Sequence, residues 1–168
     1  LLSLLVSSAS AGTFDAGGNY IKAPDAVAFV DFSNFDPAAD RYFPEMIPEA
    51  CLNDAGFELV DEAEAMSGAK VAHISVKVFD GCVERILLKL PAEQASYKAT
   101  VWVRHGGEEA RVTVLYPEAS GLETTAAYMA PTGRVTSDGW VELASNDFPV
   151  DGELATAVYL HTYNYDKE

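Results

Sequence analysis

The chain has 168 residues, 49% of them hydrophobic, which is enough for one domain with a substantial core. Its formal net charge of −15 creates a field that repels nucleic-acid phosphates and anionic lipid. We therefore expect no nucleic-acid partner and no membrane insertion. The charge is compatible with divalent cations, with neutral ligands and with a saline habitat, and it does not choose among them.

Residues 1–11 are interpreted as the remnant of a signal peptide that is not part of the fold. Leu1 to Val6 is a short apolar run, and Ala9-Ser10-Ala11 has the pattern of a cleavage site. The run is too short to span a bilayer, which needs about 20 residues. This interpretation predicts an exported bacterial protein, secreted or held at the cell surface, in a sequence truncated at its start. A disordered apolar extension is the alternative.

Residues 12–56 are predicted to add one strand and a long irregular connection to the same domain. A glycine-rich lead-in over 12–23 precedes an expected strand at 26–32, and three prolines interrupt residues 33–56. Cys51 lies in this connection and Cys82 lies in a later turn. Export favours a disulfide between them, worth about 2–4 kcal/mol, and two free thiols are the alternative.

Regular strand patterning covers residues 57–163. Strands are expected at 57–60, 71–79, 83–90, 97–105, 110–116, 124–129, 141–143 and 154–163. Gly106-Gly107 predicts that 97–105 and 110–116 form a hairpin. Pro131-Thr132-Gly133 is interpreted as a break. With the strand at 26–32, eight or nine strands and no long amphipathic helix predict an all-β antiparallel sandwich over 57–168, with 12–168 packing as one domain.

Trp140 opens the strand that follows the turn Ser137-Asp138-Gly139. A large aromatic residue directly after a turn is expected to be structural and to pack over one end of the sandwich.

Large aromatic and polar residues alternate with the apolar set on two strands. Ala99, Val101 and Val103 are expected in the core, which places Trp102 and Arg104 on the other face. Val158 and Leu160 are likewise expected in the core, which places a second outward set on the last strand: Tyr159, His161 and Tyr163. Aromatic rings stack on sugar faces, so these five residues are candidate ligand contacts if the two strands are near neighbours. The alternative is a second small core under the 33–56 connection.

Three segments resemble carbohydrate-binding modules of the galactose-binding-like jelly-roll superfamily. These are Gly56–Val60 with Met66–Val76, Tyr97–Arg104, and Gly139–Leu143, within residues 55–163. The resemblance implies a jelly-roll sandwich that binds a polysaccharide or glycan. It also implies a further closing strand after Tyr163, which predicts truncation at this end and further domains downstream.

Modules of that superfamily often hold one structural calcium ion, and calcium needs several oxygen ligands. Asp61, Glu62 and Glu64 offer carboxylates close together in the sequence, and a solvated acidic turn is the alternative. No other cofactor is expected. Zinc is not favoured, because the three histidines lie on separate strands.

Catalysis is not indicated, because the sequence lacks the G-x-S-x-G, H-E-x-x-H and Walker motifs. The first hypothesis is a secreted, non-catalytic carbohydrate-binding module of a larger extracellular protein. The alternative is a structural or protein-interaction β-sandwich of a cell-surface protein, and an unrecognised hydrolase is a remote third reading. The sequence does not identify the glycan, the oligomeric state or the organism.

Overall fold

The structure is a computed structural model that describes residues 2–7, 12–30, 32–41, 55–62, 65, 70–76, 84–104, 109–115, 123–151, 155 and 157–163. Both partners of the expected disulfide, Cys51 and Cys82, lie outside these residues, as does Glu64. The disulfide therefore stays a prediction. No helix in the described part of the chain is long and apolar enough to cross a membrane.

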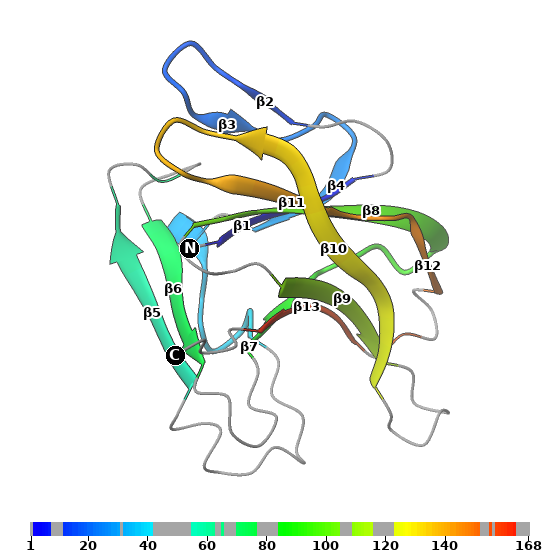
Figure 1. Ribbon diagram of the computed structural model, residues 1–168. Helices are drawn as coiled ribbons and strands as arrows, with labels where there is room; N and C mark the ends of the chain where they lie inside the picture. Colours follow the sequence, from blue (N-terminus) through cyan, green and yellow to red (C-terminus); the bar gives the residue numbers. More distant parts are fainter. Residues whose placement is uncertain are drawn as a thin grey trace.

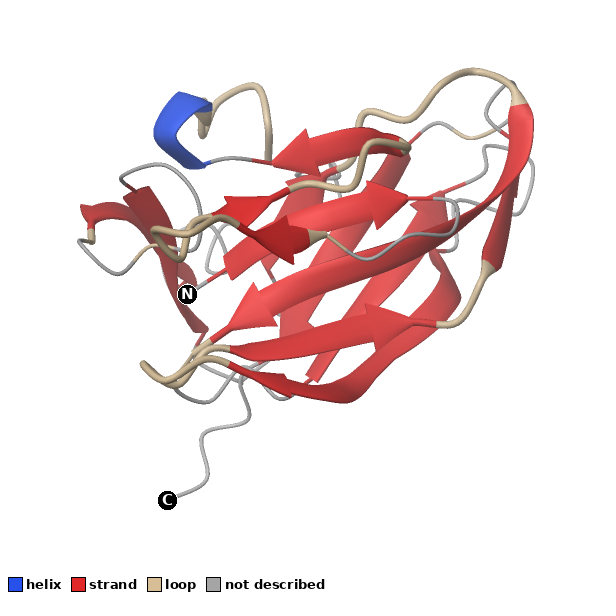
Figure 2. Ribbon diagram, turned by 90° about the horizontal axis from the view of Figure 1, so that it is seen from above, coloured by secondary structure: helices blue, strands red, loops and turns tan. Residues whose placement is uncertain are grey.

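The described residues form strands and one short 3-10 helix (Figures 1 and 2). In chain order they are β1 (Leu2–Ser7), β2 (Thr13–Phe14), β3 (Tyr20–Ile21), β4 (Ala26–Val30), η1 (Phe32–Asn34), β5 (Ala55–Asp61), β6 (Lys70–Val76), β7 (Glu84–Leu87), β8 (Gln94–Val103), β9 (Glu109–Leu115), β10 (Glu123–Val135), β11 (Val141–Ser145), β12 (Phe148–Asp151) and β13 (Ala157–Tyr163). The all-β antiparallel prediction is confirmed. The jelly-roll topology and the truncated final strand stay predictions.

Nine strands form one strongly bent sheet that folds over itself into two layers (Figure 1). The strand order is β4-β1-β8-β11-β10-β9-β13-β7, with β12 beside β8. One layer contains β4, β1, β8 and β11, and the other contains β9, β13 and β7. The first half of β10 pairs with β9 and its second half pairs with β11, so β10 belongs to both layers.

The length of β10 was not predicted, because Pro131-Thr132-Gly133 was interpreted as a break. The structure continues the strand to Val135 through an irregularity between Pro131 and Val135. Gly133 has a φ of +87°, a conformation that glycine adopts without strain. Proline and glycine are tolerated in a strand at such a bulge, where the hydrogen-bonded ladder is interrupted.

The core lies between the two layers, and the predicted alternation selects its residues. Ala99 and Val101 of β8 are fully buried there, as is Leu160 of β13. The face predictions for both strands are therefore confirmed. Burial of this apolar surface is the main favourable contribution to folding.

The hairpin predicted between residues 97–105 and 110–116 is wrong. β8 pairs with β1, β11 and β12, whereas β9 pairs with β10 and β13. The reason is that β8 and β9 lie in different layers of the bent sheet. The hairpin of this region is instead β9–β10, with Val114 opposite Thr124.

Residues 2–7 lie inside the sheet, contrary to the interpretation that residues 1–11 are not part of the fold. As β1 they pair with β4 on one side and with β8 on the other, with Leu4 opposite both Val30 and Val101. An apolar run suits a strand that has neighbours on both sides. Cleavage by a signal peptidase stays a prediction.

Two hairpins complete the structure outside the main sheet. β2 and β3 form a small hairpin on the outer side of the β8 layer, and β5 and β6 form a longer one at the side of the sandwich (Figure 1). Val71 and Ala72 of β6 are both buried. Ala72 belongs to the main core, and Val71 belongs to a second cluster, which consists of Tyr20, Ala23, Val71, Trp102 and Trp140. The β5–β6 hairpin therefore joins the two hydrophobic clusters.

Candidate functional site

The five aromatic and polar residues expected to bind a ligand do not lie on one surface. Trp102 and Arg104 belong to β8, whereas Tyr159, His161 and Tyr163 belong to β13. Three strands separate β8 from β13 in the sheet order, and the two strands lie in opposite layers. Because Trp102 and Tyr159 each lie on the face of their strand away from the shared core, these two residues face opposite sides of the molecule. The condition that the strands be near neighbours is not met.

Trp102 is buried, with 2% of its surface exposed. The β2–β3 hairpin covers it: the ring centroid lies 5.4 Å from Phe14 and 5.9 Å from Tyr20, both in edge-to-face geometry. The Arg134 guanidinium lies 5.3 Å from the centroid of the Trp102 ring. The second small core considered in the sequence analysis therefore exists at this position, and the described cover is the β2–β3 hairpin rather than the 33–56 connection.

The two aromatic residues of the hairpin, one on each strand, could have indicated this cover. Phe14 and Tyr20 stand opposite each other on β2 and β3, around a turn in which the Asp15 carboxylate accepts the N–H groups of Gly17 and Asn19. A turn of this kind between two aromatic residues is typical of a short hairpin. The glycine-rich composition concealed it.

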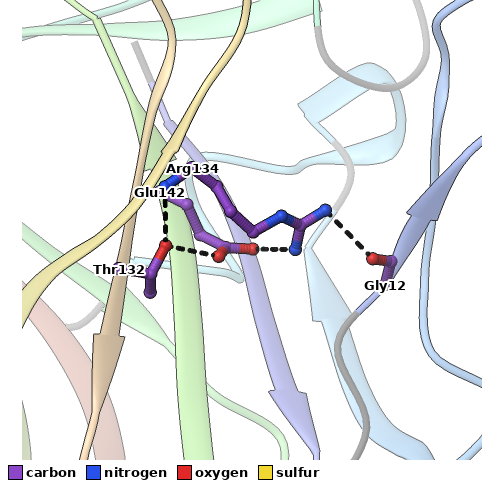
Figure 3. Close-up of polar contacts among 4 residues, drawn as sticks. All are labelled: Gly12, Thr132, Arg134 and Glu142. Atoms are coloured by element: carbon purple, nitrogen blue, oxygen red, sulfur yellow. Dashed lines mark hydrogen bonds and ion pairs between the residues drawn. The ribbon is translucent and has the colours of Figure 1, made fainter.

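A partly buried ion pair between Arg134 and Glu142 adjoins Trp102 from the β10–β11 side (Figure 3). Glu142 is 3% exposed, and its carboxylate accepts hydrogen bonds from Thr132 Oγ1 at 2.7 Å and Arg134 Nη1 at 2.6 Å. Arg134 Nη2 also donates to the carbonyl oxygen of Gly12 at 3.3 Å. These contacts tie the two strands to the start of the hairpin. Sequence reasoning missed them, because the strand was predicted to end at Met129 and Arg134 was assigned no role.

Arg104 has a structural environment rather than a ligand-facing one. Its side chain is 9% exposed, and Nη2 forms an ion pair with Glu62 at 3.0 Å. The guanidinium lies 5.1 Å from the centroid of the Trp140 ring. Trp140 is fully buried, which agrees with its expected structural role, and it packs in the same cluster as Trp102.

The turn before Trp140 has the predicted form. Gly139 has a φ of +90°, and Thr136 closes the turn by accepting the N–H of Trp140 on its hydroxyl at 3.0 Å. The backbone N–H of Thr136 donates in return to the carbonyl oxygen of Trp140. This turn places the indole ring at the start of β11.

Tyr159 is fully buried, and the Arg85 guanidinium lies 5.9 Å from the centroid of its ring. The ring therefore presents no exposed face in this structure, and its expected ligand-binding role stays a prediction. His161 and Tyr163 lie on the same strand, opposite Arg111 and Glu109 of β9. Their side chains fall outside the described residues.

The expected calcium ligands have other partners. Asp61 forms an exposed ion pair with Lys70 at 2.8 Å, and Glu62 pairs with Arg104. Among the described residues there is no group of three histidine, cysteine or acidic side chains that could hold a metal ion. Glu64 lies outside the described residues, so the calcium assignment stays a prediction.

A cavity of about 530 Å³ lies beside β4, and none of the sequence predictions pointed to it. It is lined by Val27, Ala28, Phe29, Val30, Asn34, Phe35, Asp40, Leu87 and Lys89, and we call it the β4 groove. Four of these residues are consecutive on β4. Because neighbouring side chains of a strand point to opposite faces, a cavity that touches four in a row lies along the edge of the strand.

This edge of β4 is the open one. β4 is the last strand of its layer, and among the described strands it pairs with β1 alone. Backbone N–H and C=O groups on an unpaired edge can accept another strand. Sequence reasoning could not identify the edge, because strand order depends on contacts between distant residues.

The opposite wall of the groove is held by a dense set of hydrogen bonds. The carbonyl oxygen of Asp36 accepts the N–H groups of Ala39 and Asp40, and the Asp40 carboxylate accepts the N–H of Asp36. Leu87 N–H donates to the carbonyl oxygen of Asp40 at 2.8 Å. The wall is therefore attached to β7 and is already formed before any ligand arrives.

One ion pair adds polarity to this wall. Lys89 donates a hydrogen bond to the Asp40 carboxylate and thereby holds the pKa of that carboxyl below its usual value. The lysine side chain is 68% exposed. A ligand in the groove would thus meet an apolar strand on one side and a carboxylate, an ammonium and the Asn34 amide on the other.

Comparison of the chain with protein-family models, with curated proteins and with solved structures finds no match in any of the three. The resemblance to galactose-binding-like modules therefore stays a prediction from the sequence.

Proposed function

We propose that this chain is a non-catalytic β-sandwich module that binds a segment of another protein in the β4 groove. The observation that carries the proposal is the position of the cavity along the edge of β4 with which none of the described strands pairs. Strand edges bind extended peptides through their backbone groups, and adjoining pockets bind the side chains. This is the protein-interaction alternative of the sequence analysis.

Carbohydrate binding by outward aromatic residues has less support. Stacking on a sugar needs an exposed ring face, and Trp102 and Tyr159 are 2% and 0% exposed. Their strands also lie in opposite layers. A glycan site built from these residues would require the β2–β3 hairpin to leave Trp102, which would expose the second cluster to water.

A glycan in the β4 groove is the second candidate. Carboxylate, amide and ammonium groups commonly bind sugar hydroxyls, and Asp40, Asn34 and Lys89 supply one of each. The same groove can therefore be tested for both classes of ligand in one series.

Two binding assays on the intact chain test the proposal: selection from a peptide-display library and binding to a glycan array. The variants Val27→Lys and Val27→Glu place opposite charges in the groove, at a residue that is 43% exposed and so tolerates polar groups. We expect the library to yield peptides whose affinity changes by about tenfold in one of the two variants.

Val135→Lys is the matched control, because Val135 is a 62% exposed valine of β10 that does not line the groove. It is expected to bind the selected peptides like the parent. A library that yields no peptide, or peptides insensitive to both Val27 variants, would contradict the proposal. Glycans that respond to the Val27 variants would instead support the second candidate.

The location of the module is proposed from residues 1–11 alone. Their apolar run and Ala9-Ser10-Ala11 pattern favour an exported protein, secreted or at the cell surface, in which residues 2–7 are retained as β1 beside β4. A non-catalytic role is consistent with the missing catalytic motifs.

A further inference from the structure

We propose that the occupant of the β4 groove is an extended, positively charged segment that adds to the sheet as a strand beside β4. This inference rests on the proposed function and specifies the partner's conformation and charge. Three features of the groove support it: the backbone edge, the apolar lining, and the charge of the molecule.

The backbone edge determines the conformation. Every second residue of an edge strand directs both its N–H and its C=O away from the sheet, and only an extended chain can pair with this spacing. β4 has five residues, Ala26–Val30, which offers two or three such positions. A compact ligand would leave most of these backbone groups without protein partners.

The lining determines the side chains. Val27 and Phe29 lie on one face of β4, and Ala28 and Val30 lie on the other. Phe35 and Leu87 extend the apolar surface across the groove. Phe35 is also held in place by the ring of Phe32, whose centroid lies 5.1 Å away. Because an added strand alternates its own side chains, it would place apolar groups against this surface at every second position.

The charge selects a cationic partner over a second copy of this chain. Each copy carries a net charge of −15, so two copies repel each other, whereas a basic segment is attracted from a distance. One carboxylate, that of Asp40, lines the groove, and Lys89 pairs with it. Lys89, which is mostly exposed, can move aside for an incoming lysine or arginine.

Fluorescence anisotropy with labelled seven-residue peptides tests the inference on the intact chain. The probe is Lys-Val-Thr-Val-Thr-Val-Lys, with a counterpart that carries glutamate at both ends. Two further versions carry N-methyl groups on the odd or on the even residues. Strand addition uses only one of these two sets of N–H groups, so one version is expected to lose about tenfold in affinity and the other to keep it within about twofold.

The glutamate-ended peptide is expected to bind at least about tenfold more weakly than the lysine-ended one, and the difference should shrink with added salt. Val27→Lys is expected to weaken the lysine-ended peptide and Val27→Glu to preserve it, with Val135→Lys as control. Equal loss, or no loss, with both N-methylated versions would overturn strand addition. Tighter binding of the glutamate-ended peptide would overturn the charge assignment.

The same N-methyl comparison applies to the strongest peptide from the display library. If that peptide binds in the groove and its affinity is the same with N-methyl groups on the odd residues as on the even residues, strand addition is wrong while the proposed function stands. Sedimentation tests whether a second copy of the chain occupies the edge of β4. A stable dimer of the parent chain that dissociates in Val27→Lys, but not in Val135→Lys, would show that a second copy occupies the edge and would overturn the inference.

Discussion

The Arg134–Glu142 pair shows how burial decides what one residue contributes. Glu142 is almost fully buried and accepts two hydrogen bonds, whereas the Asp61 partner of Lys70 is 82% exposed. Water screens the attraction between Lys70 and Asp61, whereas it has little access to the buried Glu142 carboxylate. The two pairs form a natural comparison within one molecule.

Replacing Glu142 by alanine is expected to lower the free energy of unfolding by about 1–3 kcal/mol, because Thr132 and Arg134 lose their buried acceptor. Asp61→Ala is expected to cost no more than about 1 kcal/mol. Urea denaturation of both variants measures the difference. Equal losses would show that the Glu142 network does not stabilise the cluster.

Tyr20 connects the same cluster to pH. Burial raises the pKa of its phenol, and the nearby Glu142 carboxylate adds to the rise. A raised pKa means that the folded state retains the proton more tightly than the unfolded state. The resulting stability is complete below the ordinary value of about 10 and is lost as the pH rises toward the folded pKa.

We therefore expect the free energy of unfolding to fall with pH above about 10, and the slope to be smaller in Tyr20→Phe. Denaturation curves between neutral and alkaline pH measure both slopes. Tyr128→Phe is the control, since Tyr128 is 72% exposed. A parent and a Tyr20→Phe variant with identical slopes would contradict this origin of the pH dependence.

At the scale of elements, the sequence predicted which side chains of a strand face the core, and it did not predict which strands pair with each other. Alternation on β8 and β13 identified Val101 and Leu160 as core residues, because side-chain direction follows from the period of a strand. The same alternation placed Trp102 away from the core, and only the tertiary structure shows that the β2–β3 hairpin covers it. Sequence pattern gives the direction of a side chain, and its exposure depends on distant segments.

Strand order was the main quantity that the sequence could not provide. Gly106-Gly107 favours a hairpin locally, and the bent sheet instead separates β8 from β9. The β4 groove follows from this order, because it requires β4 to be the last strand of its layer. The site was therefore not predictable from motifs.

Removal of β1 is expected to destabilise the sheet. A chain that begins at Gly12 leaves β8 and β4 without the strand between them. We expect a lower unfolding midpoint and concentration-dependent association, because unpaired edges pair with other chains. Thermal denaturation and sedimentation of the two chains check this. An unchanged midpoint in a monomeric shorter chain would favour the signal-peptide interpretation, in which the fold does not need residues 1–11.

At the scale of the whole molecule, the charge opposes the fold that carries it. A net charge of −15 on 168 residues produces self-repulsion that salt screens. We expect the free energy of unfolding to increase between low ionic strength and about 0.5 M salt. Chemical denaturation at several sodium chloride concentrations measures the trend. A stability that decreases with salt would indicate that attractive ion pairs outweigh the net repulsion.

The two layers also give the molecule two kinds of surface. The outer face of the β8 layer carries the β2–β3 hairpin over Trp102, whereas the edge of that layer at β4 remains open to a cavity. Binding is therefore expected at the edge of the sheet rather than on its face.

Binding at the edge of β4 is tested most directly by titrating the isotope-labelled chain with the lysine-ended peptide and following the amide chemical shifts. We predict shifts concentrated at residues 27–30 and 34–40, with slowed amide exchange along β4. Shifts confined to β8 and the β2–β3 hairpin, with β4 unchanged, would contradict it.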